Sequence, residues 1–149
     1  MNRSMRRLLS VVLASAVIAL WPAATSAQPS VPDPLVGTWV VAVTPTTGPA
    51  FSVISVFHSD GTYVHVDTNR NTALGEWVQI DDLKYRHSFQ LFTFDQGGTY
   101  AGTTTVHVEL ALDESLDAFT GTYEFKIVDS NGKVTVSSSG TRAGKRFTP

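Results

Sequence analysis

Two Tyr-x-His pairs are the residues of this sequence best suited to chemistry: Tyr63 with His65, and Tyr85 with His87. Residues two apart on a β-strand point to the same face, so each pair can present a hydroxyl and an imidazole together. In a dry cavity such groups can transfer protons during an isomerisation, a dehydration or a cyclisation. His87, Tyr85 and His65 are therefore candidate catalytic residues. The simpler interpretation, which we prefer, places both tyrosines at a rim with solvated hydroxyls, because nothing in the sequence joins a nucleophile, a base and an orienting group.

The remaining titratable motifs do not predict a metal site. No two of the four histidines have the close spacing of a local metal motif, and His107 shares its face with Glu109, which points it to solvent. His58 falls in a turn. The chain contains no cysteine, which removes thiol catalysis and cysteine-based metal sites. Phosphate-binding and dinucleotide-binding motifs are also missing, so we predict neither a metal nor a cofactor.

The first 27 residues have the layout of a secretory signal peptide. Three arginines precede residue 8, an apolar run covers Leu8 to Trp21, and small residues follow up to Ala27. The alternative is a membrane anchor, but the run is shorter than the roughly 20 residues that a spanning helix needs, and Pro22 follows it. We expect cleavage near Ala27 and a mature protein that is secreted or held in the periplasm or cell envelope, without a membrane span.

The remaining 122 residues are enough for one domain with a hydrophobic core. All 13 acidic residues but only 8 of the 11 basic ones lie in this part, so its net charge is near −5. A scattered, mildly acidic surface argues against nucleic acid or an anionic membrane as a partner. Because there are no cysteines, a secreted domain of this kind must depend on its core and not on disulfides.

The mature part reads as β-structure almost throughout, after a mobile proline-rich lead-in at 28–34. Turn signals such as Ser59-Asp60-Gly61 and Ser130-Asn131-Gly132 separate eight runs in a domain covering 35–149. These runs are 37–44, 51–57, 62–67, 74–80, 84–94, 100–112, 118–129 and 133–141. Short connections force an antiparallel up-and-down order, and closing the sheet removes its exposed edges. We predict an all-β fold, an eight-stranded antiparallel β-barrel, in preference to two packed sheets.

Alternation along the runs identifies the face that should point inward. In 84–94 this face holds aromatic and apolar residues, and in 118–129 it runs from Phe119 to Ile127. Such a wall suits a flat or apolar molecule, although it would serve equally as a plain core. Trp77 on the fourth run could line a cavity mouth or fill the core. The candidate ligand-binding residues are Tyr63, Trp77, Tyr85, His87, Phe89, Leu91, Tyr123 and Phe125.

Gly37-Thr38-Trp39 at the first run, with Arg142 after the last, resembles the signature of the lipocalins and the wider calycin superfamily. The hairpin Phe57-His58-Ser59-Asp60-Gly61-Thr62 is similar to one in compact bacterial lipocalin-like domains. The resemblance implies a barrel whose narrow end is plugged by Trp39, where Gly37 allows a tight bend and Arg142 lies over the indole. Arg146 competes for this role, and we prefer Arg142 because it lies nearer the strand.

Three functions remain open. We favour a non-enzymatic binder or carrier that encloses a small apolar molecule in the lumen. The second is a small-barrel cyclase or isomerase that uses lumen histidines and tyrosines for proton transfer. The third is a barrel with a filled interior that acts as a surface interaction module. The volume of the lumen separates the third from the first two.

Overall fold

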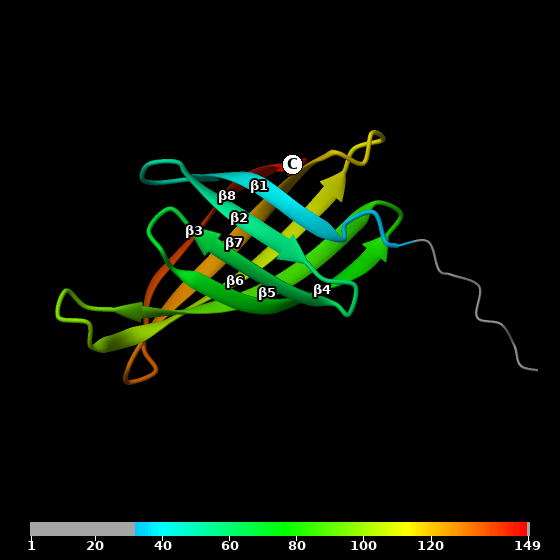
Figure 1. The fold of residues 1–149 in the computed structure, drawn as a ribbon. Coiled ribbons are helices and arrows are strands. Elements are labelled where there is room, and N and C mark those ends of the chain that lie inside the picture. The colour runs from blue at the N-terminus through cyan, green and yellow to red at the C-terminus, as the bar shows by residue number, and fades with distance from the viewer. Residues whose placement is uncertain (1–31, 149) are drawn as a thin grey trace, which may run out of the picture. The chain divides into compact units, whose positions relative to one another are not determined.

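Eight antiparallel strands pair in chain order, and the last returns to pair with the first (Figure 1). The computed structural model describes residues 32–148. The signal peptide predicted at 1–27 and most of the lead-in therefore lie outside the described residues. The strands are β1 Gly37–Pro45, β2 Phe51–Phe57, β3 Thr62–Asp67, β4 Thr72–Asp81, β5 Lys84–Phe94, β6 Tyr100–Leu112, β7 Ala118–Asp129 and β8 Val134–Arg146. The predicted all-β, up-and-down closed barrel is confirmed.

The two-residue period of the sequence decides which side chains enter the barrel. Along β6, Val106, Val108 and Leu110 are buried, whereas His107 and Glu109 between them are exposed. Register carries this pattern to the next strand, because Val106 pairs with Phe125 and Val108 with Tyr123. Inward residues therefore meet inward residues around the barrel, as sheet pairing requires.

The last strand is longer than the sequence indicated. β8 continues past Thr141 to Arg146 and pairs with β1 from Gly140 to Arg146. Two glycines make this possible, since a Cβ at Gly140 would come within 2.7 Å of the Tyr123 ring and one at Gly144 within 2.2 Å of the Phe119 ring. The residues of β8 after Thr141 are mostly small or polar, so the sequence pattern did not indicate that they extend the strand that closes the barrel.

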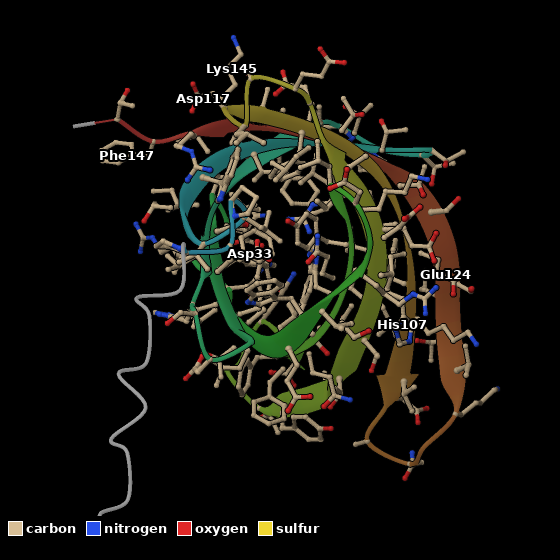
Figure 2. The ribbon with its side chains drawn as sticks, turned by 90° about the vertical axis from the view of Figure 1, so that its right-hand side faces the viewer. Asp33, His107, Asp117, Glu124, Lys145 and Phe147 are labelled. Carbon is tan, nitrogen blue, oxygen red and sulfur yellow. The ribbon has the colours of Figure 1, made fainter. Side chains whose placement is uncertain are left out.

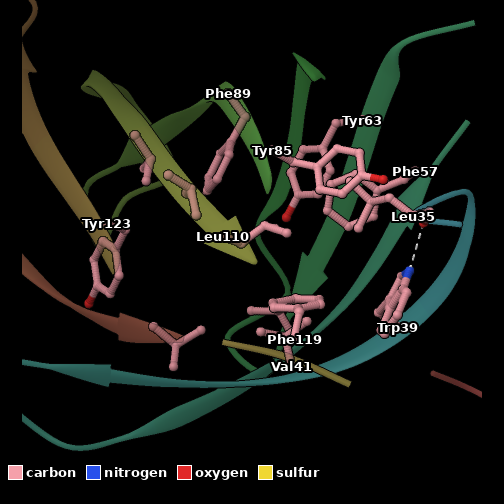
Figure 3. Packing of buried hydrophobic residues seen from close by; sticks show 14 of the residues in the cluster. Leu35, Trp39, Val41, Phe57, Tyr63, Tyr85, Phe89, Leu110, Phe119 and Tyr123 are labelled. Carbon is pink, nitrogen blue, oxygen red and sulfur yellow. Dashed lines mark hydrogen bonds between the residues drawn. The ribbon is translucent and has the colours of Figure 1, made fainter. Parts of the chain in front are cut away.

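Large side chains pack together at one end of the interior, and the close view in Figure 3 shows several of them, including Trp39, Phe57 and Phe119. Trp39 and Phe119 lie 5.1 Å apart between ring centres, and Phe57 lies 4.9 Å from Tyr63. The indole Nε1 of Trp39 donates a hydrogen bond of 2.9 Å to the carbonyl of Leu35 (Figure 3). This end of the barrel is packed, and it is the end at which β1 begins.

Residues just before β1 lie across the packed end. The carboxylate of Asp33 accepts hydrogen bonds from the Tyr85 hydroxyl at 3.0 Å and from the Leu35 amide at 2.8 Å. Viewed along the barrel in Figure 2, Asp33 falls inside the ring of strands. The described part of the expected mobile lead-in, 32–34, is thus bonded to the barrel through Asp33.

The arginine that covers Trp39 is Arg146, and the expectation that Arg142 does so is wrong. The guanidinium carbon of Arg146 lies 4.3 Å from the centre of the Trp39 ring. Register explains the difference: Arg146 pairs directly with Trp39, whereas Arg142 pairs with Val43. Four residues along a strand correspond to roughly 13 Å, which places Arg142 well inside the barrel.

In residues 32–148, no helix is long and apolar enough to cross a membrane.

Candidate ligand-binding cavity

A cavity of about 340 Å³ occupies the half of the barrel away from Trp39. The β1–β2 and β3–β4 connections border it through Thr47 and Asn71, so it opens at the end opposite the packed one. Its apolar wall includes Phe51, Phe89, Leu91, Val106, Phe125 and Ile127. Its polar lining is Thr47, His65, Asp67, Asn71, Thr93, Thr104 and Arg142, with Tyr123 between the two sets. The lumen is therefore filled on one side and hollow on the other.

Arg142 lies where the packed half meets the cavity. Arg142 is only 5% exposed, although it is one of the residues that line the cavity. Nη1 donates to Nε2 of His87 at 3.0 Å, and Nη2 donates to the Tyr63 hydroxyl at 3.4 Å. The guanidinium carbon is 5.7 Å from the centre of the Phe89 ring, and Nε has no partner among residues 32–148. Two of the five N–H donors of the guanidinium are thus used by protein groups.

The Tyr63 hydroxyl connects three polar side chains below the cavity. It lies 2.9 Å from Oγ of Ser55 and 3.0 Å from Nδ1 of His65. Both Tyr63 and Tyr85 are buried, with exposed fractions of 1% and 0%. The interpretation that placed their hydroxyls at a wet rim is wrong. Each hydroxyl finds a polar partner inside the barrel, as buried hydroxyls require.

Burial keeps both inner histidines neutral. It lowers the pKa of His65 to about 4, with a further lowering from Arg142 and a smaller opposing effect from Asp67. Burial also holds the pKa of His87 well below its usual range, again assisted by Arg142 and by His65. Because the guanidinium only donates, Nε2 of His87 must accept and its proton must sit on Nδ1. That Nδ1 is buried and finds no partner in the part of the chain that the structure describes.

The predicted ligand-binding residues divide between the two halves of the barrel. Phe89, Leu91, Tyr123 and Phe125 line the cavity. Tyr63 and His87 are not part of the lining but contact Arg142 below it.

Tyr85 and Trp77 belong to the packed end, with ring centres 5.8 Å apart, and Trp77 donates to the carbonyl of His58 at 2.9 Å. Burial and the bond to Asp33 raise the pKa of the Tyr85 hydroxyl. Of the three candidate catalytic residues, only His65 lines the cavity, whereas His87 is enclosed and Tyr85 is remote. The structure therefore does not bring the proposed proton-transfer groups together around one open space.

Sequence reasoning missed Arg142 as a residue of the lumen. The signal was present, because Gly140, Arg142, Gly144 and Arg146 share one parity and β8 would carry all four inward. The small residues around Arg142 concealed the strand. Because Arg142 was assigned to the barrel end as the arginine over Trp39, its position beside the cavity was not predicted.

Other polar groups lie on the outer wall. His107 accepts or donates a bond of 2.8 Å with Ser88 and is exposed, as its parity predicted (Figure 2). A wider depression of about 530 Å³ lies beside it, where Arg86 and Glu109 form an exposed ion pair at 2.7 Å. Residues 32–148 bring no three His, Asp or Glu side chains together in a way that could hold a metal ion. Charged and polar residues make up most of the lining of the outer depression, whereas the inner cavity has a largely apolar wall.

Comparison with known proteins finds no relative. No family model matches the chain, and no curated protein or solved structure matches it either. What the cavity can bind must therefore follow from its own residues.

Proposed function

We propose that this barrel binds one small, largely apolar molecule in the cavity at its open end and acts as a carrier or binding protein. One observation carries the proposal: a hollow of about 340 Å³ with aromatic and aliphatic walls opens at one end of an otherwise packed barrel. Ligand sites are typically apolar clefts of about 300–1,000 Å³ with few polar groups. At roughly 30 Å³ for each water, this volume suits a ligand of about ten heavy atoms.

The binder is favoured over the two alternative functions. The open cavity argues against the third function, in which a barrel with a filled interior acts only through its surface. A cyclase or isomerase would need a base on the cavity wall, and His65 is the candidate there. A pKa of about 4 makes its imidazole a weak proton acceptor at neutral pH.

The setting of this function is part of the proposal. Residues 1–27 support export to the outside of the cell, the periplasm or the cell envelope. Gly37, Trp39 and a closing arginine support a lipocalin-like assignment, with Arg146 in the role of that arginine. The intact mass of the protein recovered from its host tests the export, because cleavage near Ala27 removes the first 27 residues.

Titration calorimetry with octanol, a neutral and largely apolar molecule of about nine heavy atoms, tests the binding site. We expect saturable binding to one site per chain. Ile127→Trp places a large ring in the cavity wall and should weaken binding about tenfold or more. Ile54→Trp is the matched control, because Ile54 is 56% exposed on the outer wall. Absence of saturable binding, or equal binding by both variants, would overturn the proposal.

A further inference from the structure

We propose that the bound molecule carries a carboxylate, which the guanidinium of Arg142 holds at the inner end of the cavity while an apolar tail extends toward the mouth. This inference rests on the proposed function and specifies its ligand class. It begins from a buried positive charge that the described residues do not neutralise.

Arg142 has no acidic partner among residues 32–148. The ion pairs of this part of the chain join Lys84 to Asp81, Arg86 to Glu109 and Arg146 to Asp117. Arg142 is about nineteen-twentieths buried and keeps its charge, as arginine does in proteins. A buried charge without a counterion is unfavourable and is normally paired. A ligand anion would supply the missing charge.

The neighbours of Arg142 cannot supply it themselves. His87 and His65 are neutral, so neither imidazole brings a negative charge to the guanidinium. The Tyr63 hydroxyl is bonded to Ser55 and His65. The Phe89 ring faces the guanidinium at 5.7 Å, which compensates only weakly. Within the described residues, Nε–H of Arg142 has no acceptor. The guanidinium is therefore held in position by neutral groups and still has donors to offer.

Among the described residues, Asp67 is the one carboxylate in the cavity lining, and the β3–β4 turn already engages it. One of its oxygens accepts the amides of Asn69 and Asn71, and the other accepts the Asn71 side chain at 2.8 Å. It forms no ion pair with Arg142 within residues 32–148. Its negative charge near the mouth disfavours an anion there, so an anionic head is best placed at the inner end.

A carboxylate fits this site better than the other common head groups. A guanidinium presents parallel N–H donors that match the two oxygens of a carboxylate. A single cation is neutralised by a monoanion, whereas a phosphate monoester would leave surplus negative charge in an apolar lumen. The apolar wall of Leu91, Phe125 and Ile127 then encloses a short hydrocarbon or aromatic tail.

Three probes with the same tail and different heads test the inference on the unaltered protein: octanoate, octanol and octylamine at pH 7, each measured by calorimetry. We expect octanoate to bind about tenfold or more tightly than octanol, as one charge-assisted hydrogen bond would give. Octylamine should bind most weakly, because its cation would approach Arg142.

Two variants locate the effect. Arg142→Gln should remove the preference for octanoate over octanol and leave octanol binding nearly unchanged. Arg86→Gln removes the same charge from the outer wall, where the side chain is 55% exposed, and should keep the preference. Should Arg142→Gln fail to fold, Arg142→Lys serves instead, with a reduced but remaining preference because it keeps the charge and loses the paired donors.

The outcomes separate this inference from the proposed function. If octanol and octanoate bind equally, or if Arg142→Gln keeps the preference, the carboxylate assignment is overturned and the apolar site stands. If octylamine binds best, the inference fails in the same way. If none of the three probes binds, the proposed function itself fails.

Discussion

The guanidinium of Arg146 lies 4.3 Å over the indole of Trp39, and the two residues are direct partners across β1 and β8. Arg146 also donates to the carbonyls of Val36 at 3.1 Å and Leu116 at 2.9 Å, and to that of Pro34. One side chain thus joins the segment before β1, the β6–β7 connection and the end of β8. These three segments close the packed end of the barrel.

Arg146→Ala should destabilise the barrel by about 2–3 kcal/mol, because it removes a cation–π contact and several charge-assisted hydrogen bonds together. Urea unfolding at pH 7 measures the change. Arg86→Ala is the control, since its pair with Glu109 is exposed and should contribute at most about 1 kcal/mol. Equal losses in the two variants would show that the contacts of Arg146 do not stabilise the closed end.

Asp33→Ala should release the segment across the packed end. Asp33 accepts the Leu35 amide and the Tyr85 hydroxyl, so its loss leaves the buried hydroxyl without this partner and costs about 1–2 kcal/mol. Hydrogen exchange at the Leu35 and Val36 amides should become about tenfold faster. Asp60→Ala, which removes an exposed turn residue of the β2–β3 hairpin, should leave exchange at these two amides unchanged.

Tyr63→Phe should destabilise the protein by about 1–3 kcal/mol, because Ser55, His65 and Arg142 all lose a buried partner. Thermal and urea unfolding report the difference. Tyr100→Phe is the matched control: its hydroxyl bonds Thr103 on the exposed hairpin, and we expect a change within about 0.5 kcal/mol. A neutral effect of Tyr63→Phe would mean that water replaces the hydroxyl.

The pH dependence of stability should report the burial of His65. Its pKa is lowered from 6.5 in the unfolded chain to about 4 in the fold, so the unfolded state binds more protons between these values. Stability from this residue is complete above pH 6.5 and is lost as pH falls toward 4, by as much as about 3 kcal/mol. Arg142 strengthens the effect and Asp67 opposes it.

His65→Gln should flatten this part of the pH profile in urea unfolding between pH 7 and pH 4. His107→Gln, which changes an exposed histidine, should keep the wild-type slope. His87 contributes in the same direction as His65, because its pKa is also lowered by burial, so a slope remains in the His65 variant. A His65 variant with the full wild-type slope would contradict the burial of a neutral imidazole at this position.

Local pattern was enough to predict the strands and their inner faces. Alternation has a period of two residues, so a short segment is enough to assign Val106, Val108 and Leu110 to the same face of the strand. Turn residues such as Gly61 and Gly132, both at positive φ, marked the hairpins for the same local reason. Eight short-linked strands then left few arrangements other than a barrel.

Register over long separations was decided only in three dimensions. Trp39 meets Arg146, more than a hundred residues later in the chain, and not Arg142, because β1 and β8 pair with one particular offset. The cavity follows from the same cause, since that offset fills one end with aromatic rings and leaves Arg142 beside the other. By itself the sequence determined strands, faces and the absence of disulfides. The tertiary structure decided which arginine seals the barrel and which lies beside its cavity without an acidic partner in residues 32–148. The reason is that only strand pairing sets the distance between side chains remote in the chain.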